Sequence, residues 1–184
     1  MRIPITFPEF SDAPARMAGE HVALRPWDDG DIKVLAAAFA VADIAASMRP
    51  PVPIGMRGAR QWIDARRAMP SRQRGTSYAI TERGDEEAVG SVELRGRTGS
   101  AQVIEVGYWM MPFARDRGLG REAVDLACCW AFEQTNTDAI VAIIDAANEA
   151  SQRLVGGLGF APRARLDSND GWAGDWLLFE RERG

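Results

Sequence analysis

The sequence predicts a mixed α/β domain built on a single sheet, and three observations support this. Alternating apolar residues mark strands in the middle of the chain, and helical spacing marks the segments around them. One nearly all-apolar run, residues 138–145, is typical of a strand covered on both faces. The length of 184 residues fits one domain over 1–184, without internal repeats or linkers.

The N-terminal third is expected to be an arm followed by helices. Residues 1–20 contain three prolines and no clear period, which predicts an extended arm before a core over 21–182. We expect a first strand over 21–27, followed by three helices over about 29–40, 42–48 and 59–69.

From residue 76 the period changes to that of strands, with a Gly-Asp turn between the first two. A long helix follows the third of these strands, and a shorter helix capped by Asn148 follows the all-apolar strand. We expect strands over 76–82, 87–96, 101–111, 138–145, 160–166 and 175–182, and helices over 118–134 and about 148–156. The sheet should therefore hold about six to seven strands.

Charge and residue counts exclude several classes of function. A net charge of −4 argues against general nucleic-acid binding, which needs a basic face. Lys33 is the single lysine and no glycine precedes it, so a P-loop is excluded. His21 is the single histidine, and we expect no metal site.

The two cysteines indicate a reducing compartment. Cys128 and Cys129 are adjacent in a helical pattern, so they suit neither a structural disulfide nor zinc, and we expect buried, reduced thiols. The start of the chain lacks a signal-peptide pattern and no run approaches the length of a membrane span. We expect a cytoplasmic protein without a membrane partner. A homodimer stays open.

The segment RDRGLGREAV, residues 115–124, places three arginines and two glycines between an apolar strand and a helix. The first turn of a helix presents unpaired backbone N–H groups and partial positive charge. Gly118 and Gly120 let an anion approach the backbone, and arginines suit phosphate oxygens. The pattern favours a diphosphate site, with a solvated basic turn as the alternative.

Four segments in order resemble the GNAT superfamily of acyl-CoA-dependent N-acyltransferases, in its RimJ/RimL-type branch of ribosomal-protein N-acetyltransferases. Arg115-x-x-Gly118-x-Gly120 matches the superfamily's Arg/Gln-x-x-Gly-x-Gly/Ala loop. Asn148-x-x-Ser151 with a following LGF matches the branch, as do LRPW near the start and EVGYWMMP before the loop. The resemblance covers about residues 20–180.

The resemblance implies a twisted, mostly antiparallel sheet with helices on both faces, splayed between its fourth and fifth strands. It implies transfer of acetyl from acetyl-CoA to a primary amine by direct attack in a ternary complex. The residues that it assigns to the cofactor are Met110, Met111, Arg115, Arg117, Gly118, Leu119, Gly120, Arg121, Asn148 and Ser151.

Two residues are candidates for the chemistry. Much of the superfamily uses a tyrosine to protonate the thiolate, but Val155 occupies that position. Ser151 matches a serine of the RimJ/RimL branch and becomes the candidate to hold or protonate the thiolate, with a plain helix residue as the alternative. Glu105 is the leading base, on the strand face of Trp109, and Glu93 is second; solvent can also take the proton.

The acceptor is left open by the sequence. Trp109, Glu93, Asp170 and Trp172 are candidates to bind a cationic amine, although Asp and Trp in the last loop can be ordinary turn residues. The acceptor can be a protein N-terminus, a polyamine, an amino sugar or an amino acid, and the donor acetyl-CoA or a longer acyl-CoA.

Two departures from the family pattern keep other functions open. Asp116 adds a negative charge to the loop, and Gly156-Gly157 replaces a usual charged pair. The main alternative is a non-catalytic CoA-binding sensor or interaction domain of the same fold. A nucleotide phosphotransferase is a weaker one, because a metal-carboxylate motif is missing.

Overall fold

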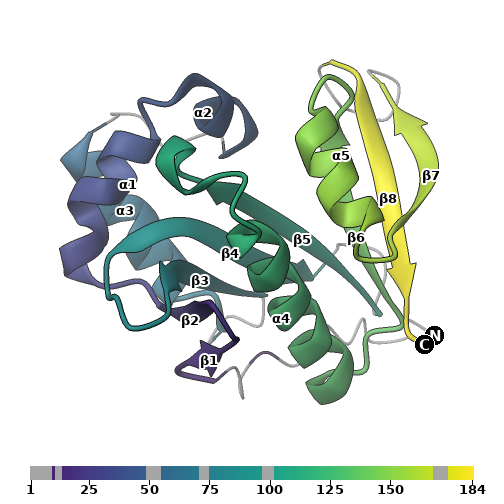
Figure 1. Cartoon of the computed structure of the whole chain (residues 1–184), viewed down its shortest axis with the longest axis horizontal. Coiled ribbons are helices and arrows are strands. Elements are labelled where there is room, and N and C mark those ends of the chain that lie inside the picture. Colours follow the sequence, from purple (N-terminus) through teal and green to yellow (C-terminus); the bar gives the residue numbers. More distant parts are fainter. Residues whose placement is uncertain (1–9, 11–13, 49–54, 71–74, 97–101, 168–173) are drawn as a thin grey trace, which may run out of the picture.

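A computed structural model describes residues 10, 14–48, 55–70, 75–96, 102–167 and 174–184. Its strands form one sheet in the order β1-β2-β3-β4-β5-β6-β8-β7 (Figure 1). They are β1 Met17–Ala18, β2 Val22–Pro26, β3 Gly75–Glu82, β4 Ala88–Gly96, β5 Val103–Met110, β6 Ala139–Asp145, β7 Ala161–Leu166 and β8 Trp176–Glu182. All neighbours pair antiparallel except β5 and β6, which confirms the predicted mixed, mostly antiparallel sheet.

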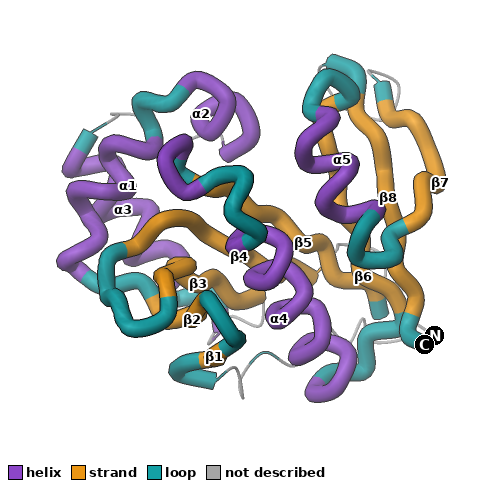
Figure 2. Tube along the Cα trace, in the orientation of Figure 1, coloured by secondary structure: helices purple, strands orange, loops and turns teal. Residues whose placement is uncertain are grey.

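Helices cover both faces of the sheet, as predicted. They are α1 Ile32–Ala38, α2 Ala42–Met48, α3 Met56–Arg67, α4 Leu119–Gln134 and α5 Glu149–Gly156, with short 3-10 turns at Asp29–Asp31 and Pro112–Ala114. Figure 2 shows α4 and α5 on one side of the strands and α1 and α3 on the other. The sheet therefore separates two layers of helices.

Side chains along β5 point alternately to the two faces of the sheet, so this strand contributes to two hydrophobic cores. Ile104 and Val106 point into the core beneath α4 and α5, and Trp109 points into the core with α1 and α3. Helix α4 buries the small residues Ala123 and Ala127, which lets it lie close to the sheet.

Within the described residues the sheet holds eight strands rather than the six to seven expected. The addition is β1, which pairs Met17 with Leu24 and Ala18 with Ala23 inside the predicted arm. Phe10 is fully buried, with its ring centroid 6.5 Å from that of Trp130. A two-residue strand is too short to show a period, which is why the sequence pattern misses it.

The adjacent cysteines carry free thiols. Cys128 is buried in the core beneath α4, and burial raises the pKa of its thiol to about 12. Cys129 is only half-buried, so the expectation of two buried thiols is right for one of them. A thiol of raised pKa is a weak nucleophile, and Cys128 is a packing residue.

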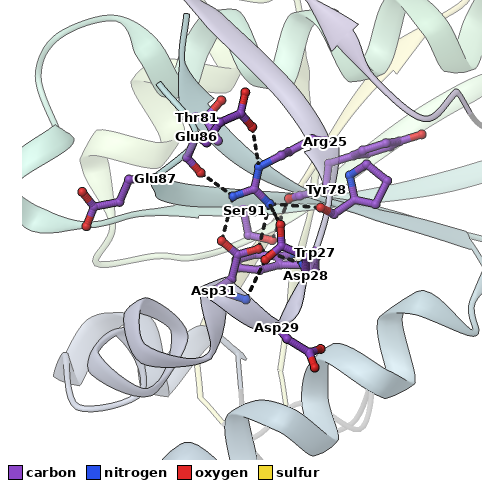
Figure 3. A network of polar contacts seen from close by, with 12 residues as sticks. Arg25, Trp27, Asp28, Asp29, Asp31, Tyr78, Thr81, Glu86, Glu87 and Ser91 are labelled. Atoms are coloured by element: carbon purple, nitrogen blue, oxygen red, sulfur yellow. Dashed lines mark hydrogen bonds and ion pairs between the residues drawn. The ribbon is translucent and has the colours of Figure 1, made fainter. Parts of the chain in front are cut away.

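Arg25 ties β2 to the turn before α1 and to the β3–β4 hairpin (Figure 3). Its Nη1 donates to Asp31 Oδ2 at 2.7 Å and its Nη2 to Asp31 Oδ1 at 2.8 Å. Nη2 also donates to the Glu86 carbonyl at 2.5 Å. Asp28 completes the network, since its N–H donates to Asp31 and its side chain accepts from Gly30. The LRPW motif therefore has a structural role in this chain.

Candidate functional site

The sheet opens between β5 and β6. Their parallel pairing covers Val103 with Ala139, Ile104 with Ile140 and Glu105 with Val141, and ends there. Beyond it β5 stays paired with β4 and β6 with β8, so the two strands diverge, as Figure 1 shows. The splay predicted between the fourth and fifth expected strands is thus confirmed, since these two strands are β5 and β6. It leaves one backbone edge of β5 facing a gap.

Two clefts lie at this gap. The loop cleft, of about 390 Å³, is lined by the end of β5, the loop before α4 and the start of α5. The strand cleft, of about 530 Å³, is lined by residues of β4, β5, β6, β8 and α5. Ser47, Tyr108, Asn148 and Ser151 line both. The two clefts therefore adjoin where β5 and β6 separate.

The loop before α4 presents the start of the helix to the loop cleft. Gly118 is the N-cap in the left-handed conformation, with φ 78°, which favours glycine. No side chain caps this helix start. Gly120 lines the cleft, and a Cβ there would lie 3.1 Å from Met110 Cγ. First-turn N–H groups, partial positive charge and the open space beside Gly118, where a Cβ would meet no atom within 4 Å, together suit a phosphate group.

The three arginines of the loop diverge. Arg115 and Arg121 line the loop cleft, whereas Arg117 is directed to Glu82 at the end of β3. Arg117 donates from Nη1 and Nη2 to the two carboxylate oxygens of Glu82 at 2.7 and 2.6 Å. This guanidinium holds the pKa of Glu82 below its usual value. The predicted contribution of Arg117 is therefore limited to its backbone unless that pair breaks.

The two arginines in the cleft are themselves held by neighbouring elements. Arg115 Nε donates to the Met110 carbonyl at 3.0 Å, and its Nη1 lies 2.9 Å from Asp43 Oδ2 of α2. Burial opposes ionisation of Asp43, but the hydrogen bond and charge of Arg115 keep its pKa below the usual value. Arg121 Nη2 donates to the Gly157 carbonyl past α5 at 2.8 Å. Both guanidinium groups are thus oriented before any ligand binds.

The start of α5 brings polar groups to the junction of the clefts. Asn148 Oδ1 accepts a hydrogen bond from the Ser151 N–H at 3.0 Å, the N-cap that the sequence predicts. The Tyr108 hydroxyl of β5 donates to the Ser151 carbonyl at 3.3 Å. Val155 is fully buried in the core, whereas Leu154 lines the loop cleft. Ser151 and Tyr108 therefore supply hydroxyl groups at this part of the gap, beside that of Ser47.

Glu93 and Glu105 lie on adjacent strands and share one arginine. Arg95 is paired in register with Glu105 and donates from Nη2 to Glu105 Oε1 at 2.5 Å, while its Nη1 lies 3.4 Å from Glu93 Oε1. Arg66 Nε of α3 donates to Glu93 Oε2 at 2.9 Å. Glu105 lines the strand cleft, but Glu93 lines a smaller cavity of about 70 Å³ beside Trp109. Glu105 is thus the better placed of the two predicted carboxylates.

Some predicted residues lie elsewhere. Met110 lines the loop cleft, but Met111 is buried in the α1–α3 core and its N–H donates to the Val89 carbonyl at 2.8 Å. Trp109 lines the loop cleft with its ring stacked on Trp27 at 6.2 Å, so it is a wall of the site and part of the core. Asp170 and Trp172 lie outside the described residues.

Sequence reasoning missed Tyr108 and the contribution of α2. Tyr108 stands in the EVGYWMMP segment that the resemblance used, so its signal was present in the motif. Asp43, Ile44 and Ser47 line the loop cleft from α2, and nothing in the sequence of this short helix indicates it. Their role follows from where the chain folds back, not from local pattern.

The described residues hold neither a metal-binding cluster nor a membrane-spanning helix. In those ranges no three His, Cys, Asp or Glu side chains come together as metal ligands. No helix in the same ranges has both the length and the apolar character needed to cross a membrane.

Comparisons with known proteins agree with this geometry. Residues 21–161 match a model of the acetyltransferase (GNAT) domain. In fold, the chain is similar to Mycobacterium smegmatis RimJ in complex with CoA-disulfide, with a TM-score of 0.79, 18% identity and coverage of 96% of this chain and 90% of that chain. It is also similar to the ribosomal-protein-S5-alanine acetyltransferase from Vibrio fischeri (TM-score 0.76, 19% identity, 92% and 97% covered).

A third similar structure is RimL, a ribosomal L7/L12 alpha-N-protein acetyltransferase in complex with coenzyme A (TM-score 0.74, 13% identity, 92% and 96% covered). At these identities the likeness is one of fold. No curated protein matches the sequence.

Proposed function

Because the chain belongs to the GNAT acetyltransferase family, we propose that it transfers acetyl from acetyl-CoA to a primary amine by direct attack in a ternary complex. The observation that carries the proposal is the pair of clefts that adjoin at the gap between β5 and β6. One cleft suits an anionic donor, and the other reaches the same gap from the strand side. Two substrates can therefore meet there without a covalent enzyme intermediate.

The loop cleft is the proposed donor site. Backbone N–H groups from Arg117 to Arg121 hold the diphosphate, helped by the guanidinium groups of Arg115 and Arg121. The pantetheine arm follows the open edge of β5 toward Asn148. Exposed N–H groups on that edge polarise the thioester carbonyl, where charge develops during attack. The uncapped helix start and the open space beside Gly118 support this fit.

The strand cleft is the proposed route of the acceptor. A neutral amine attacks the thioester carbonyl, the C–N bond forms, and the C–S bond breaks with its electron pair passing to sulfur. Glu105, directly or through water, is the proposed acceptor of the proton that nitrogen loses, with Glu93 and solvent as alternatives. Ser151 lies at the junction, where it can hold the departing thiolate.

The class of the amine is proposed more broadly. The fold neighbours are named for ribosomal proteins, which supports a protein N-terminus as the acceptor. A small-molecule amine fits the same cleft, and Glu105 would attract either through its negative charge.

The donor site is tested by calorimetric titration of the full chain with acetyl-CoA. We expect one saturable site, weakened about tenfold by Arg121→Ala because a charge-assisted hydrogen bond is lost. Arg163→Ala is the matched control, because Arg163 is an arginine of β7 that pairs with Glu180 and lines neither cleft. ATP with Mg²⁺ should not bind.

Failure of both acetyl-CoA and free CoA to bind would overturn the proposal. If they bind, thiol release is followed over protein N-terminal peptides, polyamines, amino sugars and amino acids. Binding without release on any of these classes would favour the non-catalytic CoA-binding alternative.

A further inference from the structure

The hydroxyl of Tyr108 lies where the two clefts meet. Tyr108 belongs to the part of β5 beyond the last β5–β6 pair, at Glu105 and Val141, and it lines both clefts. Its hydroxyl donates to the Ser151 carbonyl at 3.3 Å. That carbonyl lies within α5, where helical pairing gives it a second donor. A long bond to an acceptor already served is readily exchanged for a better one.

The other residues common to both clefts leave few free donors. The Ser47 hydroxyl donates to the Ile44 carbonyl of its own helix at 2.9 Å. The Asn148 side-chain oxygen accepts from the Ser151 N–H, which leaves the N–H₂ group of this amide as a donor. Besides this amide, the hydroxyl groups of Tyr108 and Ser151 are the side-chain donors able to turn toward a group in the gap.

Tyr108 is also protected from ionisation. Burial raises the pKa of its hydroxyl to about 12, although a hydrogen bond with the Ser151 side chain acts in the opposite direction. A phenol in this state keeps its proton at neutral pH and is a weaker acid than an ordinary thiol. It can therefore donate a hydrogen bond to a thiolate without surrendering the proton.

We propose that Tyr108 is a catalytic residue that donates a hydrogen bond to the coenzyme A sulfur as the C–S bond breaks. The electron pair of that bond passes to sulfur, and the Tyr108 O–H, released from the Ser151 carbonyl, stabilises the resulting negative charge. The tyrosine keeps its proton, and the thiolate takes its own from solvent. This inference rests on the proposed function, and it assigns the leaving group to the strand β5 rather than to Ser151 of α5 alone.

The test compares the affinities of two ligands by calorimetry: free CoA and desulfo-CoA, which lacks the sulfur. The titrations are done at about pH 9, because much of the CoA thiol is ionised there. We expect wild type to prefer CoA, and Tyr108→Phe to lose about tenfold in CoA affinity with unchanged desulfo-CoA affinity, because only the sulfur contact is lost. With the amine found by thiol release, kcat should fall about tenfold or more while KM for acetyl-CoA stays the same.

Tyr78→Phe is the matched control, because Tyr78 is the other tyrosine and its hydroxyl donates to the Pro14 carbonyl, away from both clefts. Thermal unfolding of both variants checks that the fold is kept. An unchanged ratio of CoA to desulfo-CoA affinity in Tyr108→Phe would overturn the inference alone. The same holds if only Ser151→Ala changes the ratio. Absence of binding of either ligand to wild type would overturn the proposed function and this inference with it.

Discussion

At the scale of single residues, Asp116 is the feature of the loop cleft that opposes its proposed ligand. It is an exposed non-glycine residue with positive φ, 58°, and it lines the cleft beside Gly118. Short polar side chains tolerate this left-handed conformation, so aspartate can hold the turn that glycine would otherwise hold. Its carboxylate nevertheless repels an incoming phosphate.

We expect Asp116→Asn to strengthen acetyl-CoA binding about threefold at low ionic strength, because asparagine keeps the conformation and removes the charge. The gain should shrink as salt is added, since exposed charges are screened. Calorimetric titration at two salt concentrations measures both effects. Asp64→Asn, an exposed acid of α3 outside both clefts, is the control. Unchanged or weaker binding in Asp116→Asn would mean that this carboxylate does not face the diphosphate.

The same loop shows what a local motif can and cannot predict. The spacing of Arg115, Arg117 and Arg121 around two glycines correctly predicts a turn at a helix start. It does not predict that Arg117 pairs with Glu82, because that contact depends on where β3 ends in space. Tyr108 was missed for a related reason: its meaning depends on α5 lying across the gap.

At the scale of elements, two glycines have opposite requirements. Gly118 starts α4 with φ 78°, whereas Gly156 ends α5 and is not among the positive-φ residues. A Cβ at either position would meet no atom within 4 Å. Substitution by alanine therefore compares backbone conformation alone, without a steric clash.

We expect Gly118→Ala to lower the free energy of unfolding by about 1 kcal/mol, because alanine is strained in the left-handed region. Gly156→Ala should raise it by about 0.5 kcal/mol, because it restricts the unfolded chain at a compatible position. Urea unfolding of both variants measures the difference. Equal effects of the same sign would contradict the conformational explanation.

Element boundaries follow the sequence well where apolar residues repeat and poorly where they do not. The strands expected at 76–82 and 138–145 appear as β3 and β6, since their apolar runs are long and bounded. Helix α3 begins at Met56 instead of 59, because Gly55 at φ 107° sets its start and no capping side chain marks it. The splay was predicted from family resemblance; strand periodicity alone does not indicate it.

At the scale of the whole molecule, Glu122 fastens α4 to the first strands of the sheet. Its Oε1 accepts from the N–H groups of His21 at 2.9 Å and Val22 at 3.4 Å, and its Oε2 lies 3.1 Å from His21 Nδ1. Burial opposes ionisation of Glu122, but these hydrogen bonds keep its pKa below the usual value. The folded state therefore favours the carboxylate.

A lowered pKa in the folded state stabilises the protein above the usual carboxyl range and stops doing so as pH falls through it. We expect Glu122→Gln to lower the free energy of unfolding by about 1 kcal/mol at pH 7, and by much less at about pH 3. Urea unfolding at both pH values is the measurement. Glu149→Gln, in an exposed pair with Arg153, is the control and should change little at either pH. A deficit that persists undiminished in acid would show a packing role instead.

The short ladder between β5 and β6 has a mechanical consequence. Within the described residues the β5–β6 ladder has three residue pairs, all at one end of the strands, and beside them the Gln102 carbonyl accepts from the Asp138 N–H at 2.8 Å. The sheet is thus V-shaped, with this ladder at its closed end, and the core beneath α4 and α5 contains residues of both arms. A molecule that binds between the arms and contacts both of them restrains the angle between them, because it opposes both closing and opening. The free energy of binding this molecule therefore depends on the angle between the two arms. Residues of the β5–β6 ladder then influence affinity without touching the ligand, because they help to set that angle.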